Sequence, residues 1–211
     1  MRRTLVFCWL SVALLVMASP AWASLPPRPV GDEANNFYIF LGVDNLDYRL
    51  DLRGATGFAA AGLDVRTVED QGMIGVGWVL ARPVRLDLVA GGGIVDVDRE
   101  GVDCSLGRAS VDLHLAVAEN RWLSVEGTLS MGVHALIYEG LVEDEAIPGL
   151  EVGVGSTVRL NLPGPLGLMT TYRWSQARFH RANIELDDET VLRVHPTAAF
   201  HSVRMLLTID L

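Results

Sequence analysis

Residues 108–118 read RASVDLHLAVA and alternate apolar and polar side chains along their whole length. Every second residue from Ala109 to Val117 is apolar, whereas Asp112 and His114 fall between them. Successive side chains of a β-strand point to opposite faces of a sheet, whereas the side chains of a helix return to the same face after about 3.6 residues. The stretch therefore predicts a strand with one apolar face and one polar face.

Two further stretches, residues 123–137 and 150–161, show the same alternation. Strands of soluble sandwiches typically have about five or six residues, so these runs are long for that class. A strand that crosses an outer membrane needs about 9–11 residues and turns alternate side chains towards lipid. Length and alternation together predict an all-β fold, an antiparallel up-and-down transmembrane β-barrel.

The connections between the alternating stretches differ in length. Short segments rich in turn-forming residues lie at 82–83, 119–121 and 162–165, and longer polar segments lie at 99–107, 139–149 and 182–196. Short turns at one end and longer loops at the other are typical of outer-membrane barrels, whose turns face the periplasm. We count eight strands, at residues 37–53, 58–81, 84–98, 108–118, 122–138, 150–162, 166–186 and 191–211.

Two of these strands change phase, one near Asp44 and Asn45 and the other near residues 70–72. We interpret both changes as β-bulges. If both were turns, the same chain would form ten strands instead. Either number is even, so both termini are expected in the periplasm.

The first 23 residues have the form of an export signal. Arg2 and Arg3 precede an apolar stretch, and Ala21 and Ala23 form a small-x-small cleavage motif. We predict a cleaved signal peptide at residues 1–23, an extended periplasmic tail at 24–36 and an outer-membrane barrel at 37–211. The mature chain keeps one cysteine, Cys104, which falls in a predicted loop and has no partner for an internal disulfide.

The composition limits the partners of this chain. Half of its residues are hydrophobic, its formal net charge is -9, and all 17 basic residues are arginine. Nucleic-acid binding is disfavoured, because phosphates require a positive patch. We expect contacts with outer-membrane lipid and lipopolysaccharide, and with the barrel assembly machinery during insertion. The partner of the predicted surface loops is not assigned.

Residues 201–211, HSVRMLLTIDL, alternate up to the last residue. In this ending, and in its strand lengths and turns over nearly all of the mature chain, the sequence resembles the small outer-membrane β-barrel proteins of the opacity-protein and OmpA-like transmembrane class. The resemblance implies an outer-membrane location and recognition of the last strand by the insertion machinery. Members of this class usually end in an aromatic residue, whereas this chain ends in Leu211.

Aromatic residues lie near both ends of the predicted strands. Phe37, Tyr38, Trp78 and Trp122 belong to the predicted periplasmic end, and Tyr138 and Phe179 lie towards the other end. Tyrosine and tryptophan favour the membrane–water interface. The sequence therefore predicts an aromatic belt at each end.

The polar faces of the predicted strands carry charges of both signs. Because an eight-stranded barrel is just wide enough to be filled by its own side chains, we expect these charges to pair across the lumen and plug it. A gated ion path is the alternative. The predicted polar network consists of Arg85, Asp87, Asp112, His114, Glu126, His134, Glu151, Arg159, Arg173, Arg204 and Asp210.

No motif in the sequence indicates catalysis. His201 and Ser202 are adjacent, so their side chains point to opposite faces of a strand, and no Gly-x-Ser-x-Gly motif is present. A serine and a histidine from different strands, for example with His180, remain an open possibility. The histidines show no metal-ligand spacing, so we predict no metal and no cofactor.

These observations favour an outer-membrane barrel with a structural or surface-interaction role and a plugged lumen. The first alternative is a narrow porin for small solutes, and the second is a lipid-modifying outer-membrane enzyme. A soluble periplasmic barrel that binds a ligand would need its apolar faces turned inward, alongside the inward arginines and aspartates.

Overall fold

The computed structural model describes residues 36–51, 62–63, 65–68, 71–81, 83–120, 122–141, 143, 145–162, 164–185 and 191–211. The predicted signal peptide and the tail up to residue 35 lie outside these ranges. Within them, no helix is long and apolar enough to cross a membrane. The strands are β1 (Phe37–Asp51), β2 (Val65–Val68), β3 (Gln71–Ala81), β4 (Val84–Val97), β5 (Asp103–Glu119), β6 (Leu123–Glu139), β7 (Glu145–Asn161), β8 (Leu166–Phe179), β9 (Ala182–Glu185), β10 (Val191–Val194) and β11 (Thr197–Asp210).

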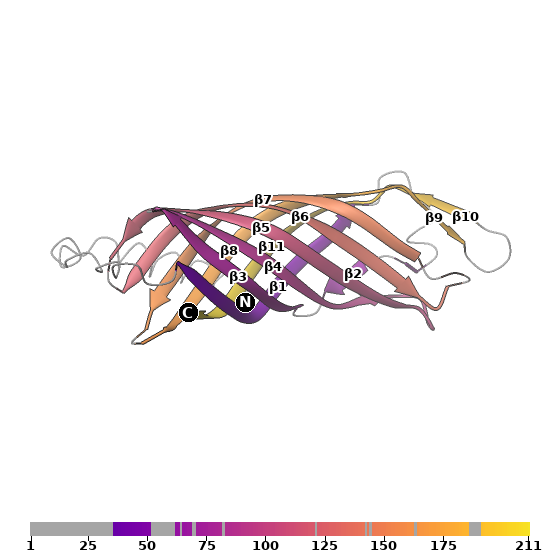
Figure 1. The fold of residues 1–211 in the computed structure, drawn as a ribbon. Helices are drawn as coiled ribbons and strands as arrows, with labels where there is room; N and C mark the ends of the chain where they lie inside the picture. The colour runs from indigo at the N-terminus through magenta and orange to yellow at the C-terminus, as the bar shows by residue number, and fades with distance from the viewer. Residues whose placement is uncertain are drawn as a thin grey trace.

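The long strands form a closed antiparallel barrel, shown in Figure 1. Its eight strands follow in the order β4-β3-β1-β11-β8-β7-β6-β5, and β5 pairs with β4 to complete the ring. The first and last strands pair directly, from Tyr38 with Asp210 to Asp51 with Thr197. The all-β, eight-stranded barrel expected from the alternation is confirmed, and the ten-stranded alternative is wrong.

The two ends of the barrel differ. At one end, which we call the turn end, short connections join β3 to β4, β5 to β6 and β7 to β8. Both barrel termini lie at the turn end, where the Leu211 amide donates to the Phe37 carbonyl at 3.1 Å. The opposite end, which we call the loop end, carries the longer connections and the β9–β10 hairpin (Figure 1).

Two predicted loops are shorter than expected. β5 begins at Asp103 and β7 at Glu145, so about half of each polar segment continues the sheet. Cys104 therefore lies in β5 and is buried, which corrects its assignment to a loop. The predicted loop at 182–196 holds β9 and β10, which pair from Val191 with Glu185 to Val194 with Ala182.

The two predicted bulges have different outcomes. The pairing of β1 with β11 runs without a register shift from Tyr38 to Asp51, so the bulge predicted near Asp44 is wrong. On the other strand, Val68 pairs with Val95 of β4 and Gly72 pairs with Gly92. Residues 69 and 70, between these two pairs, lie outside the described ranges, so the bulge near residues 70–72 stays a prediction.

The apparent phase change in β1 is a change in the surroundings of the barrel wall. Towards the turn end the outward residues Leu41 and Val43 are apolar, and the inward Asp44 is charged. Two and three residues after Asp44, Leu46 points inward and Asp47 outward. Other strands change in the same way near the loop end, because a wall that has left the lipid meets water outside and packs apolar side chains inside.

Candidate functional site in the barrel lumen

The loop-end part of the lumen holds an apolar core. It gathers side chains from most strands of the barrel and from the β9–β10 hairpin. The largest members are fully buried, among them Leu136, Tyr138, Ile147, Phe179 and Phe200. Tyr138 also donates a hydrogen bond from its hydroxyl to the carbonyl of Leu63, at 3.3 Å. This core, which we call the loop-end core, packs as the interior of a soluble protein does.

A layer of ion pairs lies next to the loop-end core. Three arginines, Arg108, Arg173 and Arg204, meet three carboxylates, those of Asp44, Asp112 and Glu151. All six residues are buried, and their charges are equal in number and opposite in sign. The Arg108 guanidinium also lies 5.7 Å from the centre of the Phe200 ring, which joins this central layer to the loop-end core.

Glu151 receives the most contacts in the central layer. Arg108 binds it with two parallel hydrogen bonds, from Nε to Oε2 and from Nη2 to Oε1, each 3.0 Å long. Arg173 Nη2 lies 3.0 Å from Oε1, and His134 Nε2 lies 2.6 Å from Oε2. Such bidentate and charge-assisted contacts are the strong class of hydrogen bond.

Asp112 organises the other side of this layer. Arg204 Nη1 donates to its Oδ2 at 2.6 Å, and the Ser130 hydroxyl donates to its Oδ1 at 2.6 Å. Ser130 Oγ in turn accepts a hydrogen bond of 2.7 Å from Arg173. The central layer is therefore one connected network across the lumen.

A second charged layer lies nearer the turn end. Arg85 Nη1 lies 2.9 Å from Glu126 Oε1, and His114 stands between Glu126 and Asp87, with contacts of 3.5 and 3.2 Å. The Tyr38 hydroxyl donates to Asp87. Arg159 completes the layer in two directions, with its guanidinium 4.5 Å from the centre of the Tyr38 ring and 2.6 Å from Asp210.

Glycines make room for the large side chains of this layer. A Cβ atom built on Gly77 would lie 2.2 Å from Cζ of Tyr38 and 2.5 Å from Oδ1 of Asp87. A Cβ atom on Gly75 would lie 2.2 Å from Cζ of Phe40. The Tyr38 ring can therefore reach Asp87 only because β3 presents bare backbone at this point.

Ten of the eleven residues assigned to the lumen from sequence are buried, and Asp210 is half-buried at the turn end. The structure divides them between two layers. Asp112, His134, Glu151, Arg173 and Arg204 belong to the central layer. Arg85, Asp87, His114, Glu126, Arg159 and Asp210 belong to the layer at the turn end.

Sequence reasoning missed two members of the central layer. Asp44 was missed because it fell at a supposed bulge, so its face could not be assigned. Arg108 shares the face of Asp112 and His114 in the same strand, and this parity is a signal that would have placed it inside. Tyr38 was also missed, because it was assigned to an interfacial belt.

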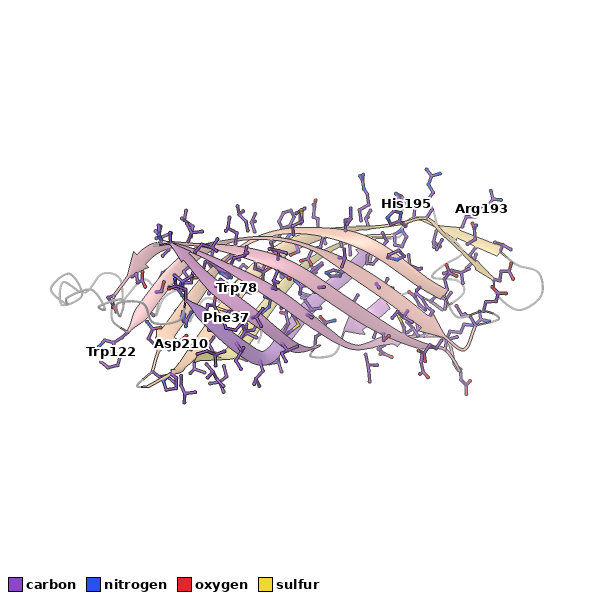
Figure 2. The ribbon with its side chains drawn as sticks, viewed as in Figure 1. Phe37, Trp78, Trp122, Arg193, His195 and Asp210 are labelled. Atoms are coloured by element: carbon purple, nitrogen blue, oxygen red, sulfur yellow. The ribbon has the colours of Figure 1, made fainter. Side chains whose placement is uncertain are left out.

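The aromatic belts need correction. Tyr38, Tyr138 and Phe179 point into the lumen and are at most 2% exposed. At the turn end the outer face keeps Trp122 and the pair of Phe37 and Trp78, whose rings meet edge to face at 5.2 Å. Figure 2 shows Trp122 at the tip of this end, and Phe37 and Trp78 next to each other further along the barrel. On the outer face of β8, further towards the loop end, Tyr172 and Trp174 are exposed.

The histidines that the structure describes have varied partners. His114 contacts Thr128, His134 contacts Glu151, and His201 accepts or donates a 2.7 Å hydrogen bond with Tyr172 on the outer face. His201 is exposed whereas Ser202 is buried, so these neighbours lie on opposite sides of the wall. Among the described residues, no group of three or more His, Cys, Asp and Glu side chains is arranged to hold a metal ion.

Comparisons with known proteins concern the fold. No family model matches the chain, and no curated protein sequence matches it. Neisserial surface protein A superposes with a TM-score of 0.58 at 11% identity, over 85% of this chain and 100% of that chain. Outer membrane protein AlkL gives 0.48 at 12%, over 89% and 96%, and the attachment invasion locus protein Ail of Yersinia pestis gives 0.47 at 11%, over 83% and 99%. The superposition on Neisserial surface protein A shows that the chain has the fold of a small outer-membrane barrel, the class that its sequence resembles.

Proposed function

We propose that this protein is an outer-membrane barrel with a closed lumen, whose role is structural or lies in contacts made by its loop end. The observation that carries the proposal is the burial of lumen-facing side chains at successive levels along the barrel. The loop-end core, the central layer and the layer at the turn end follow one another along the lumen. Solutes would have to displace all three layers to pass.

The outer face supports the membrane location. Large apolar side chains are exposed there on neighbouring strands, for example Leu129 and Met131 on β6 and Val152 and Val154 on β7. In water this surface would be unfavourable, whereas in a bilayer it matches the hydrocarbon. The short turns and both termini then face the periplasm, as is usual for such barrels, and the β9–β10 hairpin faces outward. Insertion would depend on the barrel assembly machinery.

A narrow channel is the competing function. It would need the ions of the central layer to exchange partners or to be hydrated. The equal numbers of arginines and carboxylates in that layer argue against it, since each charge already has a buried partner of opposite sign. Separating such partners in the protein interior is costly.

Electrical recording in planar bilayers tests the closed lumen. We expect no steady current from the folded wild-type protein, at voltages where a control porin conducts. Successful insertion is checked by the gel mobility of heated and unheated samples and by protease digestion of the same bilayers. A steady open current from inserted protein would overturn the proposal and favour the channel.

A pair of variants identifies the part of the plug that matters. Phe200→Ala shortens a buried side chain of the loop-end core, whereas Gln176→Ala changes an exposed residue on the outer face of β8. We expect brief openings to appear in the first variant and to stay absent in the second. Equal behaviour of the two variants would contradict a role for the loop-end core in closing the lumen.

A further inference from the structure

Basic side chains gather on the outer face of the loop end, although the chain as a whole carries a net charge of -9. They come from the junction of β8 with β9 and of β10 with β11. All of them are exposed, and within the described part of the chain none of the three arginines forms an ion pair. We call this surface the basic patch; it consists of Arg178, His180, Arg181, Arg193 and His195.

A β-bulge creates the basic patch. Ala182 pairs with Val194, and the amide of Phe179 donates to the carbonyl of Pro196 at 3.0 Å. Three residues along one strand therefore match two along the other. The extra residue leaves both His180 and Arg181 exposed, next to His195, where a regular strand would turn one of them inward.

The basic patch lies just beyond the membrane-facing surface. Along β8 the outward residues pass from Leu168 to the exposed aromatic residues Tyr172 and Trp174, then to Gln176 and Arg178. Trp174 and Arg178 are four residues apart, which is about 13 Å along a strand and roughly 9 Å along the bilayer normal at a tilt of about 45°. An exposed tryptophan marks the interface, so the basic patch lies at the depth of lipid headgroups. Figure 2 shows Arg193 and His195 at the opposite end of the barrel from Trp122 and Asp210.

We propose that the basic patch binds the phosphate groups of lipid A in the surrounding lipopolysaccharide. This inference rests on the outer-membrane location and orientation proposed above. Arginine matches phosphate oxygens with paired N–H donors, and long side chains near a membrane can extend to the headgroup level. An acidic protein is repelled by a phosphate-rich surface, and a local basic site at headgroup depth offsets that repulsion and sets how deeply the barrel sits.

In the described part of the β9–β10 hairpin the exposed acidic residue is Glu185, which pairs with Val191. It lies two residues beyond Asn183, the cross-strand partner of Arg193. Glu185 is thus displaced towards the hairpin tip, away from the membrane, and leaves the side of the patch that faces the bilayer positive.

Lipid binding by the folded full-length protein tests the proposal. Native mass spectrometry in a zwitterionic detergent would measure binding of lipid A with both phosphates and of chemically dephosphorylated lipid A. We expect the wild-type protein to bind the phosphorylated form at least about tenfold more tightly, since each arginine near an anionic surface adds to the affinity for that surface. The variant with Arg178→Gln, Arg181→Gln and Arg193→Gln together should lose this preference.

Controls separate the patch from general charge and from free phosphate. Arg99→Gln removes a positive charge elsewhere at the loop end and should bind lipid A as the wild type does. Inorganic pyrophosphate should compete only weakly with lipid A, because it lacks the acyl chains that hold lipid A against the apolar surface of the barrel.

Equal binding of the two forms of lipid A, or an unchanged preference in the triple variant, would overturn the inference. Pyrophosphate binding as tight as that of lipid A would instead assign the site to soluble phosphates and would equally overturn it. Heated and unheated gel mobility confirms folding, and the bilayer recordings described above test the closed lumen separately.

Discussion

Replacing Glu151 by glutamine keeps the shape of the side chain and removes its charge. In the native protein this carboxylate accepts two hydrogen bonds of 3.0 Å from Arg108, and Arg173 and His134 approach it at 3.0 and 2.6 Å. The glutamine amide group would place a donor against guanidinium donors. The central layer would keep three arginines and only two carboxylates.

The structure sets the size of the effect. Opposite charges about 4 Å apart attract each other by about 4 kcal/mol at an effective dielectric constant of about 20. Two arginines lose this attraction, whereas the cost of burying the carboxylate is relieved. Measured losses for breaking one partner out of a buried pair are about 3–5 kcal/mol. We therefore expect Glu151→Gln to lower the free energy of unfolding by roughly that amount.

Equilibrium unfolding in urea, with the barrel folded in lipid vesicles and followed by tryptophan fluorescence, measures this loss. Glu119→Gln is the matched control, because Glu119 lies 3.5 Å from Arg85 and its side chain is 28% exposed. A half-exposed ion pair contributes about 0–1 kcal/mol, so this control should change little.

A compensating variant makes the test sharper. Adding Arg173→Gln to Glu151→Gln makes the charges of the central layer equal again, so the double variant should lose less stability than the sum of the two single variants. If Glu151→Gln and Glu119→Gln cost the same, or if the two central changes are additive, the reasoning is refuted. The lumen would then be hydrated and its charges screened.

Two further predictions concern the wall of the barrel. Leu129→Arg places a charge on the outer face in the middle of β6 and should lower the free energy of unfolding in vesicles by about 2–4 kcal/mol. Gln176→Arg on β8 should lower it by only about 0–1 kcal/mol, because that position is near the membrane surface. Equal costs would contradict the proposed limits of the membrane-facing surface. Gly77→Ala places a methyl group 2.2 Å from the nearest side-chain atom and should cost about 1–3 kcal/mol in the same urea titration. Gly107→Ala should be close to neutral apart from backbone effects, because no described residue other than its chain neighbours comes within 4 Å of the added methyl group. A neutral Gly77→Ala would show that the side chains at the turn end are loosely packed.

The alternation of residues 108–118 was sufficient to predict β5 and its two faces. The physical reason is local, because successive side chains of any extended strand point to opposite sides. The same reasoning predicted the outward position of Leu129 and the inward position of Glu151, and the lengths of the connections led to the eight strands. The alternation of residues 201–211, from which the resemblance to small outer-membrane barrels was partly drawn, has the same local cause.

Asp44 shows where periodicity stops being enough. The hydrophobic pattern of β1 reverses between Val43 and Leu46, and a bulge was the natural interpretation. The strand is regular instead, and the environment reverses, because the wall passes from lipid to water while the lumen passes from ions to the loop-end core. The hydrophobic pattern of a strand shows which residues are apolar, but it does not show whether lipid, water or protein lies on each side of the sheet.

The sequence by itself therefore determined the class of fold and most of the residues that face the lumen, since these follow from the local geometry of a strand, whereas the choice between eight and ten strands needed the structure. Tertiary structure decided which charges share a layer and where the lumen changes from ionic to apolar. Glu151 meets Arg108 and Arg173 although 43 and 22 residues separate them in the chain, because strand tilt and register bring them to one level of the barrel. Such contacts depend on closure of the whole ring, and no local pattern encodes them.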